Sequence, residues 1–158
     1  MEFKDAIKII LKHEGGYVND PIDPGGETMM GISKRAYPHL DIKNLTKDEV
    51  KDIYYKDYWV KSKCQSIPDY LRLIYFDMVV NMGRNRAVRV LQTAINAKGL
   101  KTDIDGGIGP QTIKNAEKSK LKAGRLRSYR VKYYADLVNR KPKLEKYWYG
   151  WYKRAVAT

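Results

Sequence analysis

The sequence predicts a mainly α, α+β fold in which one small β-hairpin follows the first helix. The chain has 158 residues, a length that suits one compact domain. Apolar residues recur at helical spacing over most of it, except in the glycine- and proline-rich segment 15–33. We therefore expect a single domain over residues 1–158 with two lobes, an N-terminal lobe over residues 1–66 and a helical lobe over residues 67–158.

The first helix is predicted over residues 3–14. Apolar residues at helical spacing line one face of it: Phe3, Ile7, Ile10 and Leu11. Glu14 continues this face at the C-terminal end, and two glycines then end the helix. A carboxylate there meets apolar neighbours and the negative end of the helix dipole. A purely structural glutamate would more naturally point to water.

Turn signals dominate the segment that follows this helix. Two Asp-Pro pairs and a Gly-Gly pair favour an antiparallel hairpin or a three-stranded sheet within 17–33. Thr46 and Glu49 have the spacing of a capping box, so another helix is expected to begin near Lys47.

The remaining helices are predicted from Pro68 onward. Pro68 begins a segment that is apolar on nearly all sides and ends at Gly83, which is typical of a central buried helix. Asp77 and Asn81 are four residues apart on it and share a face. Further helical segments are expected over 86–99, from Pro110, and over about 124–139. The two tryptophans of the closing aromatic segment, Trp148 and Trp151, are expected to dock it onto the body.

The net charge of +13 predicts attraction to a polyanion, such as nucleic acid, an anionic membrane face or a cell-wall polymer. Basic residues become dense after Lys118, among them Arg125, Arg127 and Arg130, and they alternate with apolar residues at helical spacing. They form either a solvated helix face or a surface that steers substrate, and the sequence leaves both interpretations open.

Several classes of protein and site are disfavoured. No run approaches the roughly 18 apolar residues of a membrane span, and the first residues do not resemble a secretory signal peptide. We therefore expect synthesis in the cytoplasm and release by another agent. Cys64 is the only cysteine, and with two histidines it does not suit a zinc site. Asp103 cannot begin an EF-hand, because the twelfth position is Lys114. No metal or organic cofactor is implied.

Carboxylates of the glycine-rich segment are the remaining candidates for chemistry. Glu14 is followed by Asp20, Asp23 and Glu27, and then by Thr28. A carboxylic acid that faces an ionised or water-holding partner is the arrangement of glycoside hydrolysis. The alternative is that these are ordinary turn acids, an interpretation that suits the two aspartates before proline better than Glu14.

The stretch EGGYVNDPIDPGGETMMGIS closely resembles the N-terminal motif of the glycoside hydrolase family 108 muramidases. These are peptidoglycan-cleaving enzymes that include phage endolysins. The likeness continues in FDMVVNMG, VLQTAINAKG, DIDGGIGPQT and YWYGWYKR, so it covers nearly the whole chain. The segment 88–116 looks like the peptidoglycan-binding region of that family.

The resemblance implies a lysozyme-like fold and hydrolysis of the β-1,4 bond between N-acetylmuramic acid and N-acetylglucosamine. Glu14 falls on the catalytic glutamate of the family and would protonate the leaving oxygen. A more distant likeness to phage-type lysozymes implies that Asp23 stabilises the developing positive charge or orients water, and that Thr28 holds this water. Asp20 stays open as an alternative to Asp23.

Substrate-binding roles are expected for Tyr17, which could stack on a sugar, and for Asp20, Asp77 and Asn81. Peptidoglycan is the expected partner of a monomeric enzyme that acts on the cell wall, with release that could depend on a holin-type pore protein. Two other classes remain open: a non-catalytic peptidoglycan-binding module that uses residues 91–112, and a basic nucleic-acid binder. No nucleic-acid motif is visible.

Overall fold

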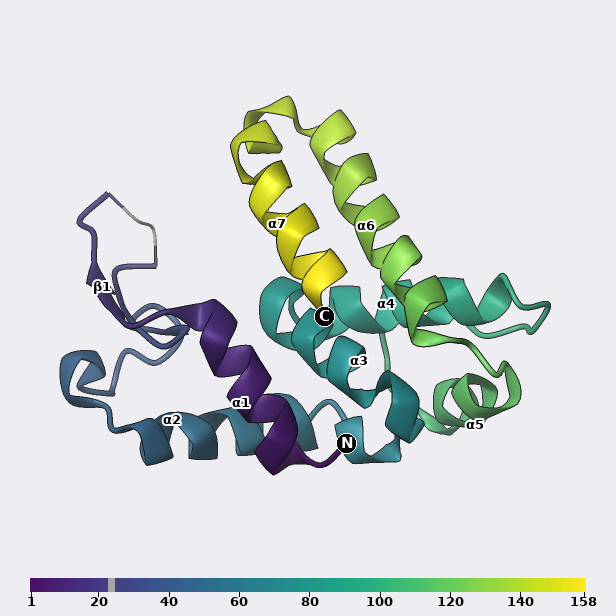
Figure 1. Cartoon of the computed structure of the whole chain (residues 1–158), viewed down its shortest axis with the longest axis horizontal. Coiled ribbons are helices and arrows are strands. Elements are labelled where there is room, and N and C mark those ends of the chain that lie inside the picture. The colour runs from purple at the N-terminus through teal and green to yellow at the C-terminus, as the bar shows by residue number, and fades with distance from the viewer. Residues whose placement is uncertain (23–24) are drawn as a thin grey trace. The chain divides into compact units, whose positions relative to one another are not determined.

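The computed structural model describes residues 1–22 and 25–158 (Figure 1). Most of these residues are helical, and a three-stranded antiparallel sheet follows the first helix, so the predicted fold class is confirmed. The chain forms two compact units, which we call the N-terminal unit (Glu2–Asp57) and the helical unit (Tyr58–Thr158 with Met1). The division falls earlier than the expected one at 66/67. The boundary between the two units falls within the π-helical segment η2 (Tyr54–Val60).

The N-terminal unit begins with the predicted helix and sheet. Its regular elements before η2 are, in chain order, α1 (Phe3–Glu14), β1 (Tyr17–Asn19), β2 (Glu27–Met29), β3 (Ile32–Ser33), η1 (Ile42–Asn44) and α2 (Lys47–Ile53). The bounds of α1 agree with the prediction, and Ile7 and Ile10 of its apolar face are buried. The strands pair in the order β1-β2-β3, so β2 is the central strand of the sheet.

The capping box at the start of α2 is confirmed. The hydroxyl oxygen of Thr46 accepts a hydrogen bond from the backbone N–H of Glu49 at 3.2 Å, and a carboxylate oxygen of Glu49 accepts one from the backbone N–H of Thr46 at 2.8 Å. These bonds hold the pKa of Glu49 below its usual range, because they favour the ionised carboxylate. Two backbone donors that the helix leaves unpaired are thereby satisfied.

The helical unit contains the longer helices. Its regular elements after η2 are η3 (Cys64–Ser66), α3 (Asp69–Met82), α4 (Arg84–Asn96), α5 (Pro110–Lys118), α6 (Ala123–Arg140), η4 (Pro142–Leu144) and α7 (Glu145–Ala157). Helix α3 packs against α4 and α6, and α6 packs against α7, which runs back beside it (Figure 1). Most side chains of α3 are buried, as expected for the central helix. Gly83, at φ +85°, ends α3 and precedes α4 directly.

The glycine-rich loop between α4 and α5 is organised around one buried amide. The side-chain nitrogen of Gln92 donates to Asp105, to the carbonyl of Gly107 and to the hydroxyl of Thr112 at 2.9–3.0 Å. Its oxygen accepts from the backbone N–H of Gly106 at 3.0 Å. The DIDGGIGPQT motif therefore folds as a loop anchored on Gln92. Among the described residues, no helix is both long and apolar enough to cross a membrane.

Candidate active site

Glu14 is the last residue of α1, and its half-buried side chain lies against the β2–β3 turn. A Cβ atom added to Gly31 of this turn would lie 2.7 Å from Oε2 of Glu14. The carboxylate is therefore in direct contact with the backbone of Gly31. Gly15, at φ +65°, ends the helix behind it. The sequence placed Glu14 at this helix end correctly, but nothing in it indicated the contact with Gly31.

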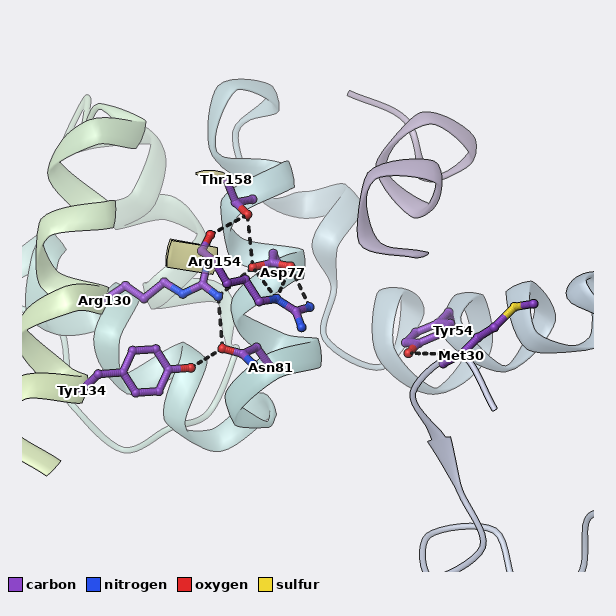
Figure 2. Close-up of polar contacts among 8 residues, drawn as sticks. All are labelled: Met30, Tyr54, Asp77, Asn81, Arg130, Tyr134, Arg154 and Thr158. Carbon is purple, nitrogen blue, oxygen red and sulfur yellow. Dashed lines mark hydrogen bonds and ion pairs between the residues drawn. The ribbon is translucent and has the colours of Figure 1, made fainter. Parts of the chain in front are cut away.

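Tyr54 is the second side chain at this turn. It is 1% exposed, and its hydroxyl donates to the carbonyl of Met30 at 3.0 Å (Figure 2). The same added Cβ at Gly31 would lie 2.3 Å from this hydroxyl. The turn itself is tight, with Met30 at φ +47° and Gly31 at φ +84°. Glu14 and Tyr54 thus approach the same glycine, which has room for both because it lacks a side chain.

The strand register separates two of the predicted site residues. Val18 is paired with Thr28, and Tyr17 is paired with Met29. Because side chains alternate between the faces of a sheet, Thr28 and Tyr17 point to opposite faces. The Tyr17 hydroxyl donates to a carboxylate oxygen of Glu27 at 2.8 Å, which raises the pKa of Tyr17. This pair was not recognised in the sequence, although Tyr17 and Glu27 are both polar positions of the hairpin.

Of the two candidate aspartates, the structure describes Asp20. Asp20 is exposed, and one oxygen of its carboxylate accepts the backbone N–H of Ile22 at 2.9 Å, so it stabilises the local turn. Asp23 lies outside the described residues. The choice between them as the second carboxylate stays a prediction.

Asp77 and Asn81 have structural partners in the helical unit (Figure 2). Asp77 is fully buried, and its carboxylate pairs with Arg130 at 2.6 Å and with Arg154 at 2.9 Å. The side-chain oxygen of Asn81 accepts from Arg130 at 3.2 Å and from the hydroxyl of Tyr134. Burial raises the pKa of Tyr134. We call these five residues the Asp77 cluster; it joins α3 to α6 and α7.

The Asp77 cluster changes two interpretations of the sequence. A carboxylate with no solvent exposure offers no surface to a sugar, so this geometry does not support direct substrate binding by Asp77. Arg130 is also fully buried, and it does not belong to a solvated or steering basic face. The sequence did not reveal this, because its partner Asp77 is remote along the chain. Arg125, which is exposed, lies over the ring of Tyr129 at 5.2 Å.

Aromatic side chains gather on α7. Trp151 stacks between Tyr134 and Tyr147, at centroid distances of 4.8 and 5.6 Å, and so docks α7 on α6. Tyr149 and Tyr152 are 66% and 41% exposed, and their spacing places them on one side of the helix. Rings of this kind offer flat apolar faces with a polar tip, which suits a partner that combines apolar surface with hydrogen-bonding groups.

Comparisons with known proteins match two successive regions of the chain. Residues 7–83 match the family model described as glycosyl hydrolase 108, and residues 86–156 match the model described as a predicted peptidoglycan domain. The solved structure of Brucella abortus SagA is similar to the chain, with a TM-score of 0.80 and 29% sequence identity over 98% of this chain and 90% of that one. No curated protein matches. The chain therefore combines a region that matches glycosyl hydrolase 108 with a region that matches the predicted peptidoglycan domain, and these matches support a glycoside hydrolase directed at peptidoglycan.

Proposed function

We propose that the chain is a muramidase, which hydrolyses the β-1,4 bond between N-acetylmuramic acid and N-acetylglucosamine with Glu14 as the general acid. The contact of the Glu14 carboxylate with Gly31 is the observation that carries this proposal. The contact holds a carboxyl group at the end of a helix. At position 31 of the turn, where φ is +84°, only glycine fits without strain. Such pre-organisation is what proton transfer in a transition state requires.

In this mechanism Glu14 donates its proton to the leaving glycosidic oxygen. A second carboxylate, from Asp23 or Asp20, stabilises the oxocarbenium-like transition state or orients water. Thr28 on β2 holds the water, while Tyr17, on the opposite face of the sheet, does not share that task and has its hydroxyl engaged by Glu27. The Tyr54 hydroxyl keeps the turn in place through Met30 rather than reacting itself.

Wall binding is assigned to the exposed rings of α7, Tyr149 and Tyr152, which lie within the segment that matches the predicted peptidoglycan domain. The charge of +13 adds a general attraction to an anionic wall. Neither contribution needs Glu14. Binding and cleavage can therefore be separated by substitution.

The test is Glu14→Gln, assayed on purified peptidoglycan together with Asp20→Asn and the wild type. The amide keeps the shape of the side chain and cannot donate an acidic proton, so the rate should fall by roughly 10²–10⁴ while wall binding persists. Mass spectrometry of the wild-type products should show reducing N-acetylmuramic acid. Ends in N-acetylglucosamine or in an anhydro-sugar would contradict the bond or the reaction, and near-normal clearing by Glu14→Gln would contradict the general acid.

A further inference from the structure

A second feature of the N-terminal unit is a groove of about 660 Å³ between α1 and α2. Its floor is apolar and is formed by every fourth residue of α1: Phe3, Ile7 and Leu11. These positions span about 12 Å along the helix axis, at about 1.5 Å per residue. Phe3 and Leu11 are half-buried, so the floor is accessible from the groove.

Lysines form both walls of the groove. Helix α1 contributes Lys4, Lys8 and Lys12, again at every fourth position, and α2 contributes Lys47 and Lys51. Two of the five are neutralised locally, because Lys8 pairs with Asp5 at 3.1 Å and Lys51 pairs with Asp48 at 2.8 Å. Among the described residues, no carboxylate lies at ion-pair distance from the other three.

This arrangement is unfavourable for the helices themselves. Like charges four residues apart on a helix repel each other. Lys4 and Lys47 are also in the first turns of their helices, where the helix dipole favours acids rather than bases. The folded chain therefore gains from anionic groups that settle beside Lys4, Lys12 and Lys47, and nothing in the mechanism proposed above uses these residues.

The apolar floor indicates which kind of anion. A polyphosphate backbone or another soluble polyanion would be held by the lysines alone and would leave Phe3 and Leu11 in contact with water. An anionic lipid satisfies both features, since its headgroup phosphate can lie between the lysine rows while an acyl chain covers the floor. The combination of an apolar strip with flanking lysines is the one that membrane-surface helices use.

We propose that the groove between α1 and α2 binds an anionic phospholipid at a membrane surface. The site does not include Glu14 or the hairpin, so it serves to hold the hydrolase at a membrane that faces the wall and does not take part in bond cleavage. Screening by salt weakens the headgroup contacts and leaves the acyl contact.

The experiment is flotation of the full chain with vesicles, measured at about 0.1 M salt where surface charges still act over roughly 10 Å. One set of vesicles is phosphatidylcholine alone, and the other contains equal amounts of phosphatidylcholine and phosphatidylglycerol. We expect selective binding to the anionic vesicles. The triple variant Lys4→Gln, Lys12→Gln, Lys47→Gln should bind them on the order of 100-fold more weakly, since each lysine near an anionic surface contributes about fivefold.

A matched variant separates the groove from the overall charge. Lys98→Gln, Lys101→Gln, Lys143→Gln removes the same charge from exposed positions of the helical unit and should weaken vesicle binding by less than about fivefold. Equal losses in the two triple variants, or equal binding of the wild type to both kinds of vesicle, would overturn the proposal. Circular dichroism and hydrolysis of soluble peptidoglycan fragments should be unchanged in all variants. Because flotation is measured without peptidoglycan, its outcome does not depend on the muramidase assignment.

The floor is tested with Leu11→Ala, which keeps a strong helix former at that position. It should weaken binding to anionic vesicles several-fold and leave binding to soluble polyphosphate unchanged. If Leu11→Ala changes neither, or lowers both alike, the groove is a site for soluble polyanions and the lipid assignment is wrong.

Discussion

Gly31→Ala tests whether the contact between the β2–β3 turn and Glu14 positions the carboxyl group that we propose as the general acid. The new Cβ would lie 2.3 Å from the Tyr54 hydroxyl and 2.7 Å from Oε2 of Glu14, so both groups, or the turn itself, must shift. Tyr54 is buried and bonded to Met30, whereas Glu14 is half-buried at a helix end. Glu14 is therefore the side chain that can move further, whereas displacement of Tyr54 costs stability.

The size of the effect has two components. Alanine at φ +84° costs about 1–2 kcal/mol of stability, because its Cβ approaches the following carbonyl in the left-handed region. That loss lowers the melting temperature by about 2–4 °C for each kcal/mol in a chain of this size. Displacement of a reacting group by about 1 Å can cost roughly 10² in rate. We expect clearing of purified peptidoglycan to slow by about this factor at a temperature where the variant is fully folded.

Gly26→Ala is the matched control. Gly26 is at φ +67°, so alanine there carries similar backbone strain, but the nearest atom to its Cβ would be Cβ of Lys34 at 3.9 Å. It should lose only the stability that backbone strain accounts for and keep its activity. Adding Tyr54→Phe to Gly31→Ala removes the closest clash and should restore some of the stability and rate. If Gly31→Ala clears peptidoglycan as fast as Gly26→Ala does, the placement of Glu14 against Gly31 is not the catalytic one.

Three other predictions concern the core, the loop on Gln92 and the second carboxylate. Asp77→Asn removes the carboxylate that pairs with the buried Arg130 and the largely buried Arg154, and it should lower the free energy of unfolding in urea by about 3–5 kcal/mol; a loss below about 1 kcal/mol would mean that the pair is not buried in solution. Hydrogen bonds from Gly107 and Gln92 lower the pKa of Asp105, so its contribution to stability is present above the unfolded pKa of about 4 and is lost as the pH falls through the lower folded value. Melting temperatures of the wild type and Asp105→Asn should therefore converge below about pH 4, and a constant difference down to about pH 2 would contradict this. Asp23→Asn should cost far more activity than Asp20→Asn, with both proteins folded, and the reverse result would identify Asp20 as the partner of Glu14.

The features that the sequence predicted are those that depend on neighbours along the chain. Helix α1 and the position of Glu14 follow from a period of apolar residues, and the start of α2 follows from the capping box at Thr46. The features it did not predict depend on partners that are distant in sequence. Tyr54 contacts the turn at Gly31, although η1 and α2 lie between them in the sequence, and no local pattern relates the two residues.

Arg130 is a second residue whose environment the local sequence did not predict. It stands in a run of basic and apolar residues that resembles a solvated helix face, and local pattern alone cannot separate one buried arginine from its exposed neighbours. Its burial is possible because Asp77 and Asn81 accept hydrogen bonds from it. The shared face of Asp77 and Asn81 was correctly expected, but what that face contacts is set by the packing of α6 on α3.

No flexible linker lies between the two regions that match family models. The first ends at Gly83 and the second begins at Arg86, but α4 already begins at Arg84, so no flexible linker separates them. Helix α3 belongs to the hydrolase match, yet it packs on α4 and α6 and pairs through Asp77 with arginines of the second match. The surface of α7 that we propose binds the wall is therefore packed, through α6, on the last helix of the hydrolase region. Wall binding by α7 would therefore be coupled to the hydrolase region through packed helices. It would not work by raising the effective concentration of a tethered domain.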